Sequence, residues 1–226
     1  MKFENIRVYN FEHALRGMRN PKESYHLIDS EFGIAPTDDV IKYCAENDCD
    51  VWDVILYTSG DYSEYAVVGP RDLQLAQALI QGGPEHRKFL RQIFVTVDIT
   101  APLYWWKEFD TYKVGTVSNS TSTMHTIHKK PFTIDDFSFD KCNSEVALQT
   151  IITIIDNLNI LREQYLATND KAYWYELIQL LPSSFNQTRM CTLNYETLIN
   201  QYYARKSHKT VWNRGQAPIP DFKMLY

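Results

Sequence analysis

The sequence predicts a helix-rich α/β or α+β fold with a small sheet, formed by one domain of residues 1–226 with an irregular C-terminal arm at 213–226. Apolar residues recur at helical spacing over several long segments, whereas strand-like alternation is confined to short ones. A chain of 226 residues with 44% hydrophobic residues is long enough to bury a core. No Gly-x-Gly-x-x-Gly or phosphate-loop motif is present, which excludes the commonest nucleotide-binding folds.

The first part of the chain alternates short helices with strand candidates. Thr37–Glu46 begins with a Thr-Asp-Asp cap and is expected to be helical. The Ser-, Gly- and Asp-rich stretch Tyr57–Tyr65 is expected to be a loop that leads into a short strand at Tyr65–Val68. Pro70 then suits the start of a helix, whose apolar residues continue at helical spacing to Ile80.

The middle of the chain contains one clear strand pattern. A short helix is expected at Glu85–Arg91, after the break at Gly82-Gly83-Pro84. Ile93–Ile99 alternates large aliphatic residues with Phe, Thr and Asp, which is typical of a strand. The aromatic-rich segment Pro102–Tyr112 is expected to be helical. Val114–Met124 is rich in Ser and Thr, a composition that suits a loop or extended segment beside a ligand.

Three helices are expected in the last third, at Asn143–Leu166, Asp170–Leu181 and Thr192–Lys206. On a wheel of the last one, Asn194, Gln201 and Arg205 fall on one flank of a broad apolar face. Such a flank is usually the solvated edge of a helix. The alternative is the border of a cleft, where Arg205 would offer its planar fork to an anion or a carbonyl.

Bulk properties exclude several classes of function. A net charge of −5 argues against binding to long nucleic acid, and no apolar run approaches the ~18 residues of a membrane span. The four cysteines form no Cys-x-x-Cys pair, and no carboxylate accompanies His125 and His128 at metal-binding spacing, so we expect no metal site. We expect a cytoplasmic protein with reduced thiols. Arg16, Arg19 and Lys22 form a basic cluster, either a solvated loop or a group that reaches a phosphate.

Two segments carry motif residues at a characteristic spacing. The C-terminal set is Leu181-Pro182, Thr188, Thr192, Asn194, Leu198, Asn200 and Arg205. The second set is His86, the strand segment Phe94–Ile99, and Ala101-Pro102. Together these segments, roughly residues 84–125 and 177–212, span about a third of the chain and resemble the flavin-dependent thymidylate synthases.

The resemblance implies that family's own α/β fold, a homotetramer with active sites shared between subunits, FAD as cofactor and dUMP as substrate. It implies a methyltransferase of nucleotide biosynthesis that takes its one-carbon unit from a reduced folate. It assigns Arg205 to the uracil, as the catalytic and substrate-binding group. It places Asn194 on the flavin side, and Asn200 and His86 near the flavin and pyrimidine rings.

The chain departs from the family at the signature triplet Arg-His-Arg, which is followed by Ser, Glu, Ser and Arg. A gapless continuation from Ala101-Pro102 puts the triplet on Thr111, Tyr112 and Lys113, and the later positions on Thr116, Asn119, Thr121 and Thr123. Lys113 is then the one basic residue of the triplet and joins the cofactor-binding set. The other four positions become the expected substrate-binding residues, with Thr123 in place of the phosphate-side arginine. A shift of one residue would bring in Ser122 and His125 instead, and both registers stay open.

Two functions of different class follow. The first is a flavin-dependent transferase that acts on dUMP or a related pyrimidine nucleotide, which Arg205 and the matched asparagines favour. The second is a non-catalytic nucleotide-binding or scaffold protein that has lost the flavin chemistry, which the missing Arg-His-Arg favours. A rebuilt loop at Thr116–Thr123 could also accept a different nucleotide, because hydroxyl and amide donors can replace arginine forks in part.

Overall fold

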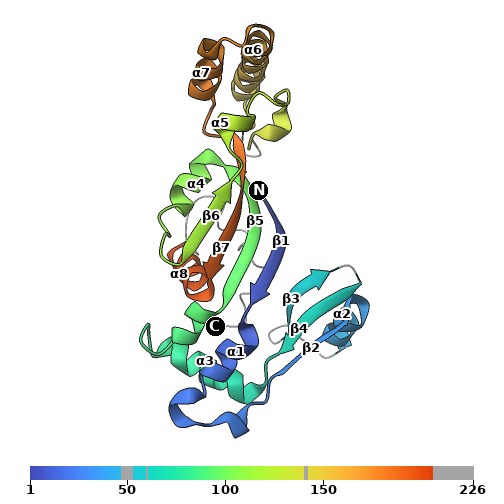
Figure 1. Cartoon of the computed structure of the whole chain (residues 1–226), viewed down its shortest axis with the longest axis vertical. Coiled ribbons are helices and arrows are strands. Elements are labelled where there is room, and N and C mark those ends of the chain that lie inside the picture. The colour runs from blue at the N-terminus through green and yellow to red at the C-terminus, as the bar shows by residue number, and fades with distance from the viewer. Residues whose placement is uncertain (47–52, 60, 140–141, 206–226) are drawn as a thin grey trace. The chain divides into compact units, whose positions relative to one another are not determined.

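The computed structural model describes residues 1–46, 53–59, 61–139 and 142–205, so the predicted arm at 213–226 lies outside it. One sheet has four strands in the order β1 (Lys2–Tyr9), β5 (Phe94–Pro102), β7 (Asn186–Asn194) and β6 (Thr116–Ser120). The other has three in the order β2 (Glu31–Pro36), β4 (Tyr62–Val67) and β3 (Asp53–Ser59) (Figure 1). The α-helices are α1 (Phe11–Gly17), α2 (Thr37–Glu46), α3 (Pro70–Gln81), α4 (Leu103–Phe109), α5 (Thr123–Thr126), α6 (Glu145–Thr168), α7 (Lys171–Leu180) and α8 (Tyr195–Arg205). The predicted helix-rich fold with small sheets is confirmed.

The chain divides into two compact units. The first unit comprises Met1–Glu4, Asp98–Thr111 and Ser118–Met190. The second comprises Asn5–Val97, Tyr112–Val117 and Cys191–Tyr226. Each strand of the four-stranded sheet contributes residues to both units. That the whole chain behaves as one domain stays a prediction.

In the first unit α6 and α7 lie side by side (Figure 1), and both helices pack with residues 127–137 around one apolar cluster. Its buried members are Ile127, Phe132, Phe137, Ile151, Leu158 and Leu177. Ile151 and Leu158 are seven residues apart, so they fall on one face of α6 and pack against the loop that precedes the helix. Ser144 caps the start of α6, because its hydroxyl accepts a hydrogen bond from the Ala147 N–H at 3.2 Å.

The second unit contains the three-stranded antiparallel sheet, and α2 packs on β2 and β4 of that sheet (Figure 1). This unit also buries an ion pair between Arg19 and Asp72. The Arg19 Nη2–Asp72 Oδ1 distance is 2.7 Å, and the two side chains are 6% and 1% exposed. The interpretation of Arg19 as part of a solvated or phosphate-binding cluster is therefore wrong, since its guanidinium is buried and joined to a carboxylate.

Several elements agree closely with the sequence. The helices predicted from Thr37 and from Pro70 are α2 and α3, and the long helix predicted at Asn143–Leu166 is α6. The aromatic segment after Pro102 is α4, and the strand predicted at Ile93–Ile99 is β5. At Glu85–Arg91 the structure instead has a short 3₁₀ helix, Lys88–Gln92.

The predicted loop at Tyr57–Tyr65 is wrong. β3 continues to Ser59 and β4 begins at Tyr62, and the two strands pair in antiparallel register. Tyr and Thr are good strand formers, and Ser59 and Ser63 themselves lie within the paired strands. Within the described residues, no helix is both long and apolar enough to cross a membrane.

The predicted helix at Thr192–Lys206 begins too early. Residues Asn186–Asn194 form β7, and α8 starts at Tyr195. The helical-wheel argument that put Asn194 and Arg205 on one helix therefore fails for Asn194. The reason is local: the Asn194 carboxamide satisfies the first turn of α8 from outside the helix, as described next.

Candidate functional site

The junction of β7 and α8 is held by the side chain of Asn194. Asn194 Oδ1 accepts a hydrogen bond from the Thr197 N–H at 2.9 Å, and Thr197 Oγ1 lies 3.1 Å away from it. This is the pattern of an N-cap, which satisfies one of the otherwise unpaired N–H groups of the first helical turn. Asn194 is 9% exposed. Its carbonyl oxygen is thus committed to α8, and the amide Nδ2 is the part of the side chain that faces Gly115.

The segment Tyr112–Gly115 runs along α8. Thr197 Oγ1 donates to the carbonyl oxygen of Val114 at 2.7 Å, and Arg205 Nε donates to the hydroxyl of Tyr112 at 2.9 Å. The guanidinium of Arg205 also lies 5.6 Å from the Tyr112 ring centroid. Three of the predicted site residues (Arg205, Asn194 and Lys113) are therefore carried by two neighbouring segments of the second unit.

Gly115 makes this close approach possible. Its φ is +72°, and a Cβ at this position would lie 2.3 Å from Asn194 Nδ2. A side chain is excluded both by the backbone conformation and by the neighbouring amide. Next to it, Thr116 Oγ1 is buried and has no hydrogen-bond partner in the described part of the chain. Of the predicted substrate-binding residues in those ranges, Thr116 is thus the one whose buried hydroxyl is left unpaired.

Gln201 lies one turn from both Thr197 and Arg205 on α8. Its side chain is 2% exposed, and neither Oε1 nor Nε2 has a hydrogen-bond partner among the described residues. The sequence placed Gln201 on the polar flank but gave no reason to single it out. Its burial is a property of the packed helix, so a periodicity argument could not have found it.

Asn200 lies on a different side of α8 from Arg205, and the segment that carries His86 adjoins that side. Five residues separate Asn200 from Arg205, which is about 140° of helical rotation. Asn200 is exposed, and its Oδ1 accepts a hydrogen bond from Arg87 Nη2 at 3.3 Å. Arg87 follows the exposed His86 directly and also pairs with Glu196 at 2.9 Å. Arg87 thus joins the His86 segment to Asn200, away from the Arg205 flank.

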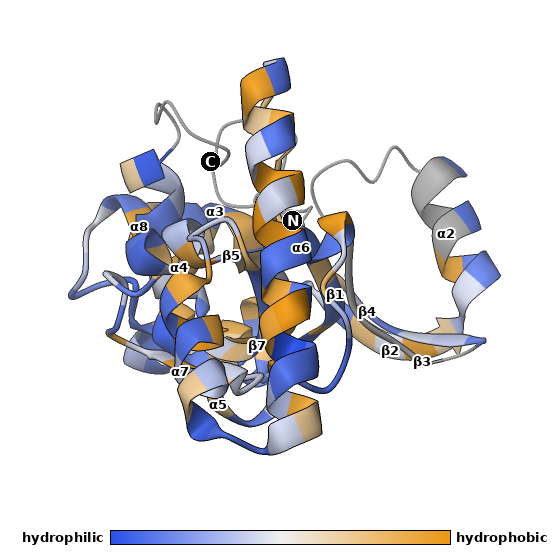
Figure 2. Cartoon of the chain, turned by 90° about the horizontal axis from the view of Figure 1, so that it is seen from above, coloured by the Kyte–Doolittle hydropathy of each residue, from blue (hydrophilic) through white to orange (hydrophobic). Residues whose placement is uncertain are grey.

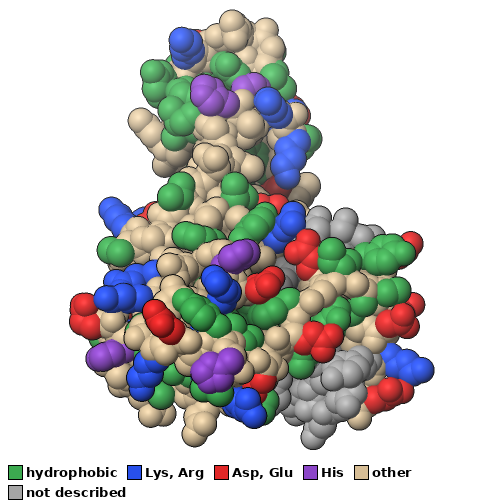
Figure 3. Space-filling view, turned by 60° about the horizontal axis from the view of Figure 1, so that its bottom comes forward, with side chains coloured by type: hydrophobic (Ala, Val, Ile, Leu, Met, Phe, Trp, Pro, Cys, Tyr) green, Lys and Arg blue, Asp and Glu red, His purple; other side chains and the backbone are tan. Residues whose placement is uncertain are grey.

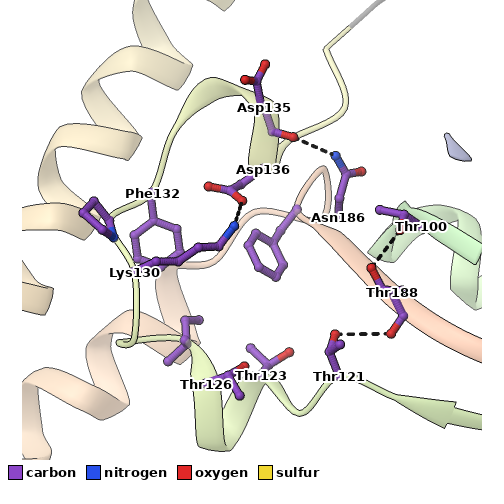
Figure 4. Close-up of a pocket in the computed structure, with 13 residues that line it drawn as sticks. Thr100, Thr121, Thr123, Thr126, Lys130, Phe132, Asp135, Asp136, Asn186 and Thr188 are labelled. Carbon is purple, nitrogen blue, oxygen red and sulfur yellow. Dashed lines mark hydrogen bonds and ion pairs between the residues drawn. The ribbon is translucent and has the colours of Figure 1, made fainter.

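The remaining predicted substrate residues lie in the first unit. Asn119 is exposed on β6, whereas Thr121 and Thr123 line a cavity of about 300 Å³ (Figure 4). Thr121, Thr123 and Thr126 lie along one side of this cavity, and the ion pair of Lys130 and Asp136 lies on another. The lining threonines are Thr100, Thr121, Thr123, Thr126 and Thr188. Two of these hydroxyls, on Thr100 and Thr188, bond to each other at 2.7 Å.

The charge of this cavity does not favour a phosphate. Lys130 is the basic residue among the lining residues, and its Nζ lies 2.6 Å from Asp136 Oδ1. Burial raises the pKa of Asp136, but hydrogen bonds from Lys130 and Thr133 outweigh it and hold the pKa below its ordinary value. The ammonium is thus neutralised by a carboxylate, and Asp135 adds a further negative charge.

Sequence reasoning also passed over Arg189. Its Nη1 donates to Asp110 at 2.9 Å, its Nε donates to Gln187 at 3.0 Å, and its guanidinium lies 4.2 Å from the Trp106 ring centroid. Recognising residues 186–194 as a strand would have shown that Gln187 and Arg189 share one face of it. No three His, Cys, Asp or Glu side chains gather at metal-binding distance in the described ranges.

Comparison with known proteins gives a structural likeness alone. No model of a protein family matches the chain, and no curated protein matches it by sequence. Two crystal structures of the flavin-dependent thymidylate synthase ThyX from Helicobacter pylori, both with FAD and dUMP, are similar to it at 14% sequence identity. The first match covers 100% of this chain and 94% of that chain with a TM-score of 0.63. The second covers 100% of both chains with a TM-score of 0.58. The chain therefore has the fold of these thymidylate synthases.

Proposed function

We propose that this chain is a divergent flavin-dependent thymidylate synthase that binds FAD and a pyrimidine nucleotide such as dUMP. In this proposal it transfers a one-carbon unit from a reduced folate to the pyrimidine, as a cytoplasmic homotetramer. The observation that carries the proposal is the likeness to two FAD- and dUMP-containing structures along the full length of the chain. The motif at Asn194, Asn200 and Arg205 supports it from the sequence side.

The charged groups around α8 suit an anionic ligand. Arg87 and Arg91 both pair with Glu196, at 2.9 and 3.3 Å. Two guanidinium groups thus accompany one carboxylate on the side of α8 that carries Asn200. A phosphate-bearing ligand is attracted by such an excess. The unpaired hydroxyl of Thr116 adds a hydrogen-bonding group within the expected substrate segment.

In the proposed chemistry, Arg205 recognises the uracil. Its guanidinium would donate to a ring carbonyl and stabilise the negative charge that develops on the pyrimidine as C5 becomes nucleophilic. The Tyr112 hydroxyl, which accepts from Arg205 Nε at 2.9 Å, would hold the guanidinium in one orientation. FAD, when bound, would supply the hydride. Asn194, Asn200, His86 and Lys113 are the proposed flavin-binding residues.

Calorimetric titration with dUMP tests this role of Arg205. We expect Arg205→Ala to weaken dUMP binding by about 10- to 100-fold, the value of a charged hydrogen bond, with little change in the thermal unfolding midpoint. Lys129→Ala, which removes the same charge from an exposed side chain, is the matched control and should bind like the wild type. Unchanged affinity and stability in Arg205→Ala would show that the assigned site is wrong.

A second candidate is a nucleotide-binding relative without flavin chemistry. The paired Lys130 and the presence of Thr123 at the phosphate-side position favour it, because the cavity at Thr121 and Thr123 has no surplus cation among its lining residues. Under this alternative the protein binds a nucleotide but retains no FAD. The same titrations performed with FAD and with dUMP separate the two functions.

A further inference from the structure

A stripe of three side chains on α8 faces the segment Tyr112–Gly115. Thr197, Gln201 and Arg205 are spaced by four residues, so they succeed each other along one side of the helix over about 12 Å. The two ends of the stripe bond to the segment, through Val114 at Thr197 and through Tyr112 at Arg205. The segment therefore passes the turn of the helix that carries Gln201.

Gln201 is the unusual member of this stripe. A primary amide offers one acceptor and two donors, and a buried amide normally has partners for them. Here both polar atoms of a side chain that is 2% exposed lack a partner within the described residues. An apolar side chain of the same size would avoid this desolvation cost. Such a local violation is expected at a functional site, where a ligand provides the missing partners.

The chemistry of a carboxamide defines what would pair with it. An amide donor and an amide acceptor, side by side, complement a group that offers a carbonyl next to an N–H. A cyclic imide has this edge, and both the uracil of a pyrimidine nucleotide and the isoalloxazine of a flavin carry one. Arg205, one turn further along the same stripe, would supply a second donor to a carbonyl of the same ring.

We propose that Gln201 reads the imide edge of a bound uracil or isoalloxazine ring, in concert with Arg205. The inference rests on the proposed function and deepens it by naming a recognition residue. Because Gln201 is 2% exposed, the ring reaches it only after some of the residues that bury the stripe move away. The segment Tyr112–Gly115 is hydrogen-bonded to both ends of the stripe. Its residues Lys113 and Val114 are exposed, so the segment has room to move outward.

The test combines stability with binding. In Gln201→Met the amide is replaced by an apolar group of similar length, and Gln201→Leu repeats the change with a branched side chain. Thermal unfolding is measured without ligand. Affinities are measured for FAD by flavin fluorescence, and for dUMP and N3-methyl-dUMP by calorimetry. Gln164→Met, an exposed glutamine on α6, is the matched control.

We expect the ligand-free Gln201 variants to be as stable as the wild type or more stable, because an unpaired buried amide is removed. They should lose at least tenfold in affinity for one of the two ligands. A loss for dUMP, together with loss of the wild type's preference for dUMP over N3-methyl-dUMP, assigns the uracil. A loss for FAD assigns the isoalloxazine. Either result supports the proposal, since a purely structural glutamine would move stability and leave affinity unchanged.

Variants that bind both ligands like the wild type would overturn this inference and leave the proposed function standing. Lower ligand-free stability with unchanged affinities would overturn it too, because Gln201 would then serve folding alone. A wild-type protein that binds neither FAD nor dUMP would overturn the proposed function, and the ligand assigned to Gln201 with it.

Discussion

The contact between Arg205 and Tyr112 is the most informative single interaction at the proposed site. The hydroxyl of Tyr112 accepts from Arg205 Nε, so it fixes the plane of the guanidinium without neutralising its charge. We expect Tyr112→Phe to weaken dUMP binding by about 3- to 10-fold, because the arginine loses one orienting hydrogen bond. Calorimetry measures this, with Tyr62→Phe on an exposed tyrosine as control. An unaltered affinity in Tyr112→Phe would mean that this contact does not prepare Arg205 for a ligand.

Asp72 is the residue on which the second unit depends most. It accepts hydrogen bonds from Arg19 Nε, Arg19 Nη2, Ser30 Oγ and the Asp29 and Ser30 N–H groups. We expect Asp72→Asn to lower the free energy of unfolding by about 3–5 kcal/mol, because it leaves Arg19 as an uncompensated buried charge. Asp61→Asn, at an exposed carboxylate, should change it by less than about 0.5 kcal/mol. Urea unfolding of the two variants gives the comparison, and equal stability would contradict this account.

The pH dependence of stability follows from the same carboxylate. Burial raises the pKa of Asp72, but hydrogen bonds from Ser30, Arg19 and Asp29 outweigh it and bring the pKa below its ordinary value. A group whose pKa is lower in the folded state stabilises that state above its unfolded pKa, near 3.8. We therefore expect wild-type stability to fall as the pH drops below about 5, and the fall to be smaller in Asp72→Asn. Urea unfolding at a series of pH values measures both slopes, and parallel slopes would contradict the assignment.

At the scale of elements, two glycines with positive φ form a natural comparison. Gly83 has φ +93° and no atom within 4 Å of the place a Cβ would take, whereas Gly115 has φ +72° and would place a Cβ 2.3 Å from Asn194 Nδ2. Gly83→Ala should lower the free energy of unfolding by about 1 kcal/mol, from backbone strain alone. Gly115→Ala should lower the free energy of unfolding by clearly more, because its methyl group would also push the segment before β6 away from the Asn194 side chain. Asn194→Ala should relieve part of the Gly115→Ala cost in a double-mutant cycle, and strict additivity would contradict the contact.

The sequence predicted elements well where a single periodicity dominates. α3 has regular apolar spacing and starts at Pro70 as expected, so its bounds were nearly right. The junction at Asn194 was misplaced, because β7 and α8 are contiguous and their apolar residues merge into one run. The β3–β4 hairpin was missed for another reason: turn-forming residues outnumber the apolar ones around its connection. Both errors lie where local composition is ambiguous and tertiary pairing decides.

The candidate site was predictable only in part. Arg205 came from a spaced motif, and the structure puts it, half-buried, at the end of α8. Gln201 and Arg189 were not found, since their interest depends on burial and on partners that lie far away in the sequence. The expected substrate-binding residues Thr121 and Thr123 line a cavity, yet the charge of that cavity depends on Lys130 and Asp136, which no motif contained.

At the scale of the whole molecule, exposed apolar residues predict assembly. Figure 2 shows apolar residues distributed along α6, and Val146, Ile152, Ile160 and Leu166 on this helix are 77%, 48%, 53% and 53% exposed. On the face drawn in Figure 3, acidic and basic side chains are interspersed among apolar ones. Such apolar exposure on one helix is typical of a surface that pairs with another subunit.

We expect light scattering after gel filtration to give four times the chain mass of 26.5 kDa. Ile152→Glu should shift the protein to smaller species, because it puts a charge into an apolar contact, whereas Gln164→Glu should not. A monomeric wild type would contradict the homotetramer and the shared active sites that go with it.

Retention of flavin tests the central claim most directly. The purified protein is incubated with FAD and passed through gel filtration, and the visible spectrum of the protein peak is recorded. The account predicts that FAD co-elutes with the protein, with its absorption bands shifted by the binding site, and that dUMP perturbs the bands further. A colourless protein peak would contradict the flavoenzyme, and it would leave a thymidylate synthase fold that serves another ligand.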